Sequence, residues 1–168
     1  QYYDWTKPKT MITSGSLGTM GFGIPSAIGV QLAKKNANVI CFDGDGSFMM
    51  TGNDLATIKE YNLPIKIFIM NDSKQQMVHI WQKLFFNERY ISTDNFNPDF
   101  NIYADSFGIE NIYCDNQDDL DAAVQLSIEY DGPILINCKV IPDMCTPLVA
   151  PGCALDDMII DAKKTHVG

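Results

Sequence analysis

Short apolar runs alternate with segments of helical spacing along most of this sequence. Two runs, residues 39–42 and 65–70, have the length and β-branched content of buried parallel strands, and residues 53–61 between them have helical spacing. A strand, a helix and a second strand in this order form a βαβ unit, whose two strands end at the same edge of the sheet. We therefore expect the polar residues that follow these two strands to lie close together.

The same alternation continues through the rest of the chain. The pattern predicts helices over residues 24–36, 75–86, 98–107 and 118–130, and strands over residues 11–13, 109–114 and 133–140. Strands that alternate with helices in this way are typical of an α/β fold. The sequence therefore predicts a doubly wound parallel sheet with helices on both faces.

Length and composition indicate one ordinary globular domain. The chain has 168 residues, of which 46% are hydrophobic and 20% are charged. We divide it into a lead-in segment with the first strand (1–13), a main domain (14–141) and a proline-containing tail (142–168) that we expect to pack on or over the domain. The chain begins with Gln1 instead of Met, so we expect it to be a piece of a longer polypeptide.

Charge and cysteine content narrow the partners and the compartment. A net charge of −9 argues against nucleic acid and anionic membrane surfaces as partners. No run reaches the roughly 18 apolar residues of a membrane span. Five cysteines without a C-x-x-C pair favour reduced thiols in a cytoplasmic compartment, or in an organelle if a transit peptide lies outside this chain.

Polar residues and glycines follow both strands of the βαβ unit. Gly44, Asp45, Gly46 and Ser47 come after the first strand, and residues 71–73 (Asn-Asp-Ser) come after the second. Mg²⁺ prefers an octahedron of hard oxygen ligands at about 2.1 Å and keeps phosphate oxygens in its shell. We therefore interpret the convergence of Asp45 and Asp72 as a site for a magnesium-bound phosphate group.

Glycines beside Asp45 have a physical purpose in this interpretation. Gly44 permits a tight exit from the strand, and Gly46 with Ser47 can bring backbone N–H groups close to a diphosphate. The backbone carbonyl of Lys74 could complete the ligands that the protein gives to the metal.

Two other interpretations compete with a magnesium site. Residues 21–26 come close to the G-x-G-x-x-G pattern of dinucleotide-binding proteins, and Asp43 lies where the ribose-binding acidic residue would be expected. That interpretation leaves Asp45 and Asp72 unexplained. Alternatively, both aspartates are simple turn residues, since Asp next to Gly is common in turns.

Several motifs together resemble one enzyme family. The glycine-rich segment SGSLGTMGFGIPSAIG (14–29), GDG (44–46) followed by ND (71–72), and NPDF (97–100) resemble the catalytic subunits of acetolactate synthase (acetohydroxyacid synthase). The likeness covers about residues 14–160 and corresponds to the C-terminal domain that binds the diphosphate of thiamine diphosphate.

The resemblance implies roles for individual residues. It gives Mg²⁺ the ligands Asp45, Asp72 and the carbonyl of Lys74, and it gives the substrate channel Gln76, Met77 and Trp81. It implies that the cofactor contacts Gly18, Thr19, Met20, Gly44, Gly46, Ser47, Gln75 and Met77. The Met20 side chain would be the apolar wedge that bends the cofactor. For Met77 and Trp81, packing in the core is an equal alternative.

The resemblance also implies an activity, which a full-length enzyme would carry out. It would decarboxylate pyruvate and join the product to a second 2-keto acid, as a homo-oligomer, with FAD in a domain that is absent here. The glutamate that activates the cofactor lies on another domain in this family, so we assign no catalytic residue to this chain and expect it to be inactive alone.

Departures from the family pattern keep other functions open. Asp72 replaces the usual Asn and adds a negative charge near an anionic cofactor, and Gln76 replaces the usual Gly. Substrate preference is therefore open, and a different thiamine-dependent 2-keto acid decarboxylase is one alternative. The other is a non-catalytic cofactor-binding or structural module.

Overall fold

The computed structural model describes residues 3–142 and 148–160. Contacts divide the chain into two compact units, and each unit is described by itself. The first unit comprises Gln1–Asn71 and Asn97–Lys139, and the second comprises Asp72–Phe96 and Val140–Gly168.

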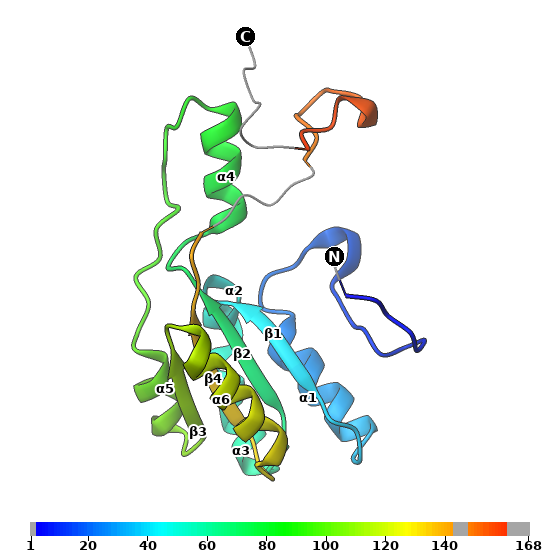
Figure 1. The fold of residues 1–168 in the computed structure, drawn as a ribbon, viewed down its shortest axis with the longest axis vertical. Helices are drawn as coiled ribbons and strands as arrows, with labels where there is room; N and C mark the ends of the chain where they lie inside the picture. Colours follow the sequence, from blue (N-terminus) through cyan, green and yellow to red (C-terminus); the bar gives the residue numbers. More distant parts are fainter. Residues whose placement is uncertain (1–2, 143–147, 161–168) are drawn as a thin grey trace. The chain divides into compact units, whose positions relative to one another are not determined.

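A parallel sheet forms the centre of the first unit (Figure 1). Its strands are β1 (Ile40–Gly44), β2 (Lys66–Asn71), β3 (Glu110–Cys114) and β4 (Ile134–Lys139), in the order β1-β2-β4-β3. All three pairings are parallel, so the four carboxyl ends lie at one edge. Strands β2 and β4 lie in the middle, which is why their sequences are almost continuously apolar.

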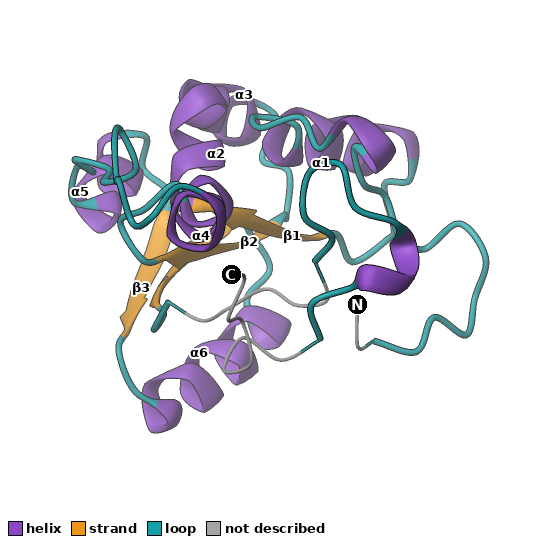
Figure 2. Cartoon of the chain, turned by 90° about the horizontal axis from the view of Figure 1, so that it is seen from above, coloured by secondary structure: helices purple, strands orange, loops and turns teal. Residues whose placement is uncertain are grey.

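Helices cover both faces of this sheet (Figure 2). One face carries α1 (Gly23–Ala33), α2 (Asp45–Thr51), α3 (Leu55–Glu60) and α5 (Phe100–Ser106), and the other carries α6 (Gln117–Glu129). The connection from β3 to β4 runs back across the sheet, opposite to the connection from β1 to β2. Because parallel crossovers are right-handed, the reversal places α6 on the opposite face. The predicted α/β fold with helices on both faces is confirmed.

The core lies between the sheet and the face that carries α1, α2, α3 and α5. Phe48 of α2 is fully buried, and its ring meets that of Phe100 edge to face with centroids 5.4 Å apart. The β2 side chains Ile67 and Ile69 are also fully buried in this core. The core therefore fixes α2, which follows β1 directly, against the sheet.

Four local predictions differ from the structure. Strand β1 is buried on one face only, because it is the edge strand of this sheet and α6 covers β3 and β4 instead; Phe42 is 68% exposed. Residues 11–13, predicted as a first strand, are not in a strand. A helix begins at Asp45, where a loop was expected, and the predicted helix over residues 53–61 corresponds to the shorter α3.

The second unit contains helix α4 (Gln76–Phe85). Residues 93–95, which follow this helix, are hydrogen-bonded to residues 73–75, which precede it. The N–H of Gln75 donates to the carbonyl of Thr93 over 2.7 Å, and the N–H of Asn95 donates to the carbonyl of Ser73 over 2.8 Å. In the tail, Leu148 and Ile159 form an antiparallel bridge. The predicted packing of the tail on the domain falls partly on residues 143–147 and 161–168, which lie outside the described residues, and it stays a prediction.

Within the described part of the chain, no helix is both long enough and apolar enough to cross a lipid bilayer.

The buried ring of Phe48 gives a test of this core. Replacing Phe48 with Ala should lower the free energy of unfolding by about 3–5 kcal/mol, because the substitution leaves a cavity among fully buried side chains. Urea unfolding followed by circular dichroism measures the change. The matched control is Phe96→Ala, whose ring is fully exposed and whose loss should change the unfolding free energy by less than about 0.5 kcal/mol. Equal effects of the two variants would contradict this description of the core.

Candidate functional site

Asp45 and Asn71 lie side by side at the carboxyl edge of the sheet. Gly44 pairs with Met70, so the residues that follow them, Asp45 and Asn71, lie at the same level. Asp45 is the first residue of α2 and is only 2% exposed. A carboxylate so thoroughly removed from water needs hydrogen-bond partners or a cation.

Asn97 bridges these two residues. Its Nδ2 donates to Oδ2 of Asp45 over 2.6 Å and to Oδ1 of Asn71 over 3.3 Å. Asn97 is the first residue of the first unit after the chain returns from the second, and it precedes α5. The edge of the sheet thus holds a buried carboxylate whose orientation is set by a neutral amide donor.

The two glycine segments of the sequence meet beside this edge. The N–H of Gly21 donates to Oγ of Ser47 over 2.9 Å, and Oγ1 of Thr51 donates to the carbonyl of Gly21 over 3.2 Å. Gly21 has a φ of 77°, and a Cβ there would lie 3.0 Å from the Cβ of Met50, so only glycine allows this approach. The structure therefore places Ser47 and residues 18–21 in one region.

Three residues of the glycine-rich segment that are predicted to contact the cofactor lie on the open side of that region. Gly18 and Thr19 are exposed, and Met20 is half-buried. A Cβ added at Gly18 or at Gly44 would meet no atom within 4 Å. The space over both glycines is therefore open to a ligand.

A second buried carboxylate, Asp43, lies on β1, two residues before Asp45. Its Oδ1 accepts from the N–H of Gly44 over 3.1 Å, whereas its Oδ2 is buried with no hydrogen-bond partner among the described residues. Burial raises the pKa of Asp43, and hydrogen bonds from Ser47 and Gly44 lower it in part. Burial, together with the charge of Asp43, raises the pKa of the Cys41 thiol to about 12. Asp43 packs against α1, since a Cβ at Gly23 would lie 2.7 Å from its Oδ2.

Asp72 and Lys74 belong to the second unit. Oδ1 of Asp72 accepts from the N–H of Lys74 over 3.0 Å, and Ser73 between them has a left-handed φ of 57°. The Lys74 ammonium forms an ion pair with Asp94. The hydrogen bond and charge of Lys74 lower the pKa of Asp94. This turn therefore holds the backbone of Lys74 next to the side chain of Asp72.

The predicted substrate-channel residues lie in or next to α4, in the same unit. Met77 is 46% exposed, and Trp81 is half-buried with its ring 5.1 Å from that of Phe85. The side chain that α4 buries fully is Ile80, so core packing does not account for Met77. Gln75 donates through Nε2 to Oδ1 of Asn95 over 3.1 Å, and Oε1 of Gln76 is buried with no partner among the described residues.

The chemistry of these residues fits a magnesium diphosphate. The structure brings together Asp45, Ser47 and the glycine-rich segment within the first unit. The buried carboxylate of Asp45 is a hard oxygen donor of the kind Mg²⁺ takes. Among the described residues, no three His, Cys, Asp or Glu side chains gather as a metal site, and the predicted set has only two carboxylates.

The sequence analysis assigns no role to two asparagines near Asp45. Asn97 belongs to the NPDF motif, and Asn137, whose Oδ1 accepts from Nδ2 of Asn71 over 3.2 Å, lies in the predicted strand over residues 133–140. The available signal was Asn137 itself, a polar side chain within the otherwise apolar run that forms β4. A polar residue in such a strand indicates a buried hydrogen-bond partner.

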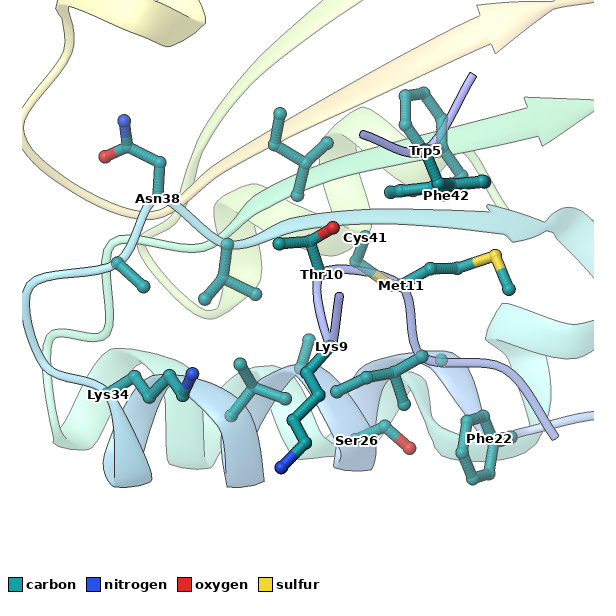
Figure 3. A pocket seen from close by; sticks show the side chains of 17 residues that line it. Trp5, Lys9, Thr10, Met11, Phe22, Ser26, Lys34, Asn38, Cys41 and Phe42 are labelled. Carbon is teal, nitrogen blue, oxygen red and sulfur yellow. The ribbon is translucent and has the colours of Figure 1, made fainter. Parts of the chain in front are cut away.

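A separate cavity of about 380 Å³ lies along the outer edge of β1 (Figure 3). Trp5 and Met11 from the lead-in segment, Ser26 and Lys34 from and just after α1, and Phe42 from β1 are among its lining residues. None of the predicted cofactor or metal residues is among the described residues that line it. The cavity is therefore distinct from the carboxyl edge of the sheet.

Comparison with known proteins identifies a family for this chain. Residues 1–138 match the profile of the family described as "Thiamine pyrophosphate enzyme, C-terminal TPP binding domain". The chain is 42% identical over 161 residues to the acetolactate synthase isozyme 2 large subunit of Escherichia coli K12, covering 95% of this chain and 29% of that protein.

Algal and fungal proteins show the same similarity. The chain is 44% identical over 160 residues to the acetolactate synthase large subunit of Pyropia yezoensis, covering 94% of this chain and 27% of that protein. It is 42% identical over 162 residues to the mitochondrial acetolactate synthase catalytic subunit of Saccharomyces cerevisiae, covering 95% and 23%. The chain thus spans less than a third of the length of these relatives.

The raised thiol pKa values near the sheet give a test by alkylation. At pH 8 a thiol with a pKa of about 12 (Cys41) or about 11 (Cys138) is almost entirely protonated, and only the thiolate reacts. We expect iodoacetamide to modify the exposed Cys153 of the folded protein and to leave Cys41 and Cys138 unmodified. Peptide mass spectrometry measures the extent, with the urea-unfolded protein as the control in which all three react. Comparable rates for Cys41 and Cys153 in the folded protein would contradict the assignment.

Proposed function

Because the chain belongs to the thiamine pyrophosphate enzymes, as their C-terminal cofactor-binding domain, we propose that it holds Mg²⁺ and the diphosphate in an acetolactate synthase-like enzyme. The single observation that carries this proposal is the position of the Asp45 side chain. Its carboxylate is buried at the carboxyl end of β1, level with Asn71 and hydrogen-bonded to Asn97. Ligands of α/β proteins bind at this edge of the sheet.

We propose that the metal takes the carboxylates of Asp45 and Asp72 and the carbonyl of Lys74, and that Gly44, Gly46 and Ser47 contact the diphosphate. The chain carries a net charge of −9, so a divalent cation is needed to bring an anionic diphosphate to a carboxylate. Asp72 adds a second carboxylate and so strengthens the attraction for the metal. The Lys74 ammonium already pairs with Asp94, which supports a metal ion as the neutralising charge.

Residues of the glycine-rich segment would hold the other end of the cofactor. Gly18 and Met20 could offer backbone atoms to the aminopyrimidine, and Thr19 between them is exposed and could also contact the cofactor. Met20 is half-buried, and its unbranched side chain is suited to be the wedge against which the cofactor bends. The hydrogen bonds from Gly21 to Ser47 and from Thr51 to Gly21 would keep this segment in register with the diphosphate site.

The substrate side of the proposed site is formed by α4. Bound thiamine diphosphate supplies the electron sink for decarboxylation of a 2-keto acid such as pyruvate. Gln75 and Met77 would border the cofactor, and Gln76, Met77 and Trp81 would shape the channel for the small substrate. The buried Oε1 of Gln76 has no hydrogen-bond partner within residues 3–142 and 148–160, which supports this role, since a substrate or cofactor donor could satisfy it.

We further propose that this domain is half of an active site. The glutamate that activates the cofactor in this family would come from a different domain, normally on a partner subunit, and FAD would bind through a third. A homo-oligomer would then be needed to complete the site.

Calorimetry of thiamine diphosphate binding tests the metal site. Binding by the parent should depend on Mg²⁺, and Asp45→Ala should weaken it by more than about 100-fold, because loss of a direct ligand costs more than loss of an outer partner. The control is Asp121→Ala on α6, an exposed aspartate on the other face of the sheet. The proposal fails if Asp45→Ala binds as tightly as the parent.

Activity of the chain alone tests the half-site proposal. We expect the purified chain, supplied with thiamine diphosphate, Mg²⁺ and pyruvate, to release no CO₂ and form no acetolactate above the level of the cofactor without protein. The reason is that the activating glutamate is supplied by another domain. A full-length acetolactate synthase such as that of E. coli is the positive control, and measurable turnover by the chain would contradict the proposal.

A further inference from the structure

Five asparagine side chains form one continuous hydrogen-bonded row in the first unit, which we call the amide row. From the buried end at Asp45 to the exposed end on α5, its members are Asn97, Asn71, Asn137, Asn101 and Asn111. An aspartate lies at each end of the row: Asp45 at the sheet edge and Asp105 on the surface of α5.

The first half of the row begins at the proposed metal ligand, Asp45. Asn97 Nδ2 donates to Asp45 Oδ2 over 2.6 Å and to Asn71 Oδ1 over 3.3 Å. Asn71 Nδ2 then donates to Asn137 Oδ1 over 3.2 Å. Asn71 ends β2 and Asn137 lies in the neighbouring strand β4, so this half runs across the sheet.

The second half of the row connects the sheet to α5. Asn137 Nδ2 donates to Asn101 Oδ1 over 3.0 Å, and Asn101 Nδ2 donates to Asn111 Oδ1 of β3 over 2.9 Å. Asn111 Nδ2 donates to Asp105 Oδ1 over 2.6 Å. Asp99 caps α5 by accepting from the N–H of Asn101 over 2.9 Å, which fixes where the helix begins.

The two terminal carboxylates determine which way every amide points. An ionised carboxylate only accepts, so Asn111 must turn its NH₂ group to Asp105 and Asn97 must turn its NH₂ group to Asp45. Each oxygen between them then accepts from the preceding NH₂ group. Turning any one amide around would place two oxygens or two NH₂ groups face to face, so the row has one arrangement.

The cost of this row suggests a purpose beyond filling space. Asn137 is 5% exposed within the otherwise apolar β4, where an aliphatic side chain would pack without needing partners. A network whose members are all satisfied is rigid and specifies one geometry. What the row holds at its buried end is the carboxylate of Asp45.

We infer that Asn97 is a positioning residue for the metal ligand Asp45, and that the amide row holds Asn97 in place; this inference rests on the proposed function. Partners that orient a ligating carboxylate act on metal affinity without touching the ion. A neutral amide orients Asp45 while leaving its full negative charge to attract Mg²⁺.

The choice of metal ion separates positioning from general stabilisation. Mg²⁺ demands near-ideal octahedral geometry, whereas Ca²⁺ accepts six to eight oxygens in irregular arrangements. A less firmly held Asp45 should therefore weaken the binding of Mg²⁺ more than the binding of Ca²⁺. A fold that is merely less stable would weaken the binding of both ions by the same factor.

The experiment measures the Mg²⁺ and the Ca²⁺ concentrations that half-saturate thiamine diphosphate binding, by calorimetry on the purified protein. For Asn97→Ala we expect the Mg²⁺ value to rise about 10- to 100-fold, with a smaller rise for Ca²⁺. The matched control is Asn53→Ala, an exposed asparagine in the short 3₁₀ helix Gly52–Asp54, for which both values should stay those of the parent.

A second variant keeps the test decisive if Asn97→Ala fails to fold. Asn137→Leu breaks the row without contacting Asp45 and should shift the Mg²⁺ value in the same direction by at least about twofold, again more than the Ca²⁺ value. Equal factors for the two ions, or no rise for Mg²⁺ while the parent binds in a metal-dependent way, would overturn the inference and leave the proposed function standing. Absence of metal-dependent binding by the parent would overturn both.

Discussion

The parallel register between β1 and β2 is the constraint on which the rest of the site depends. Pairing of Gly44 with Met70 brings the first residue of α2 level with the last residue of β2. A slip of one residue would turn Asp45 away from Asn71 and would also move the alternate side chains of β1 out of the core. The same apolar packing that stabilises the sheet therefore aligns the polar groups at its edge.

The sequence was sufficient for the architecture, whereas the role of Asp45 stays a proposal. The runs that became β2 and β4 are so apolar that only the middle of a parallel sheet suits them, and right-handed crossovers then place α6. The exposed face of β1 was not predictable, because Phe42 reads as a core residue until the position of α6 is known. The amide row was missed because its members are scattered along the chain and meet through side chains, which no local pattern encodes.

Acidity shapes the chemistry of this edge. In a protein with a net charge of −9, a lysine could pair with a buried carboxylate. Its ammonium would then compete with a metal ion for the negative charge of that carboxylate. An amide avoids the competition, since its N–H orients the carboxylate and neutralises nothing. Asn97 beside Asp45 is thus compatible with metal binding in a way that a cation would not be.

The amide row also bears on how this protein ages. Asparagine is a thermolabile residue, and hydrolysis of its amide gives a carboxylate of nearly the same shape. In the middle of the row, such a change would replace an NH₂ donor with an oxygen that faces another oxygen, and no rotation would restore the bonds because the two ends are fixed. Hydrolysis of a single amide in the row would then leave Asp45 less firmly oriented while the fold itself stayed intact.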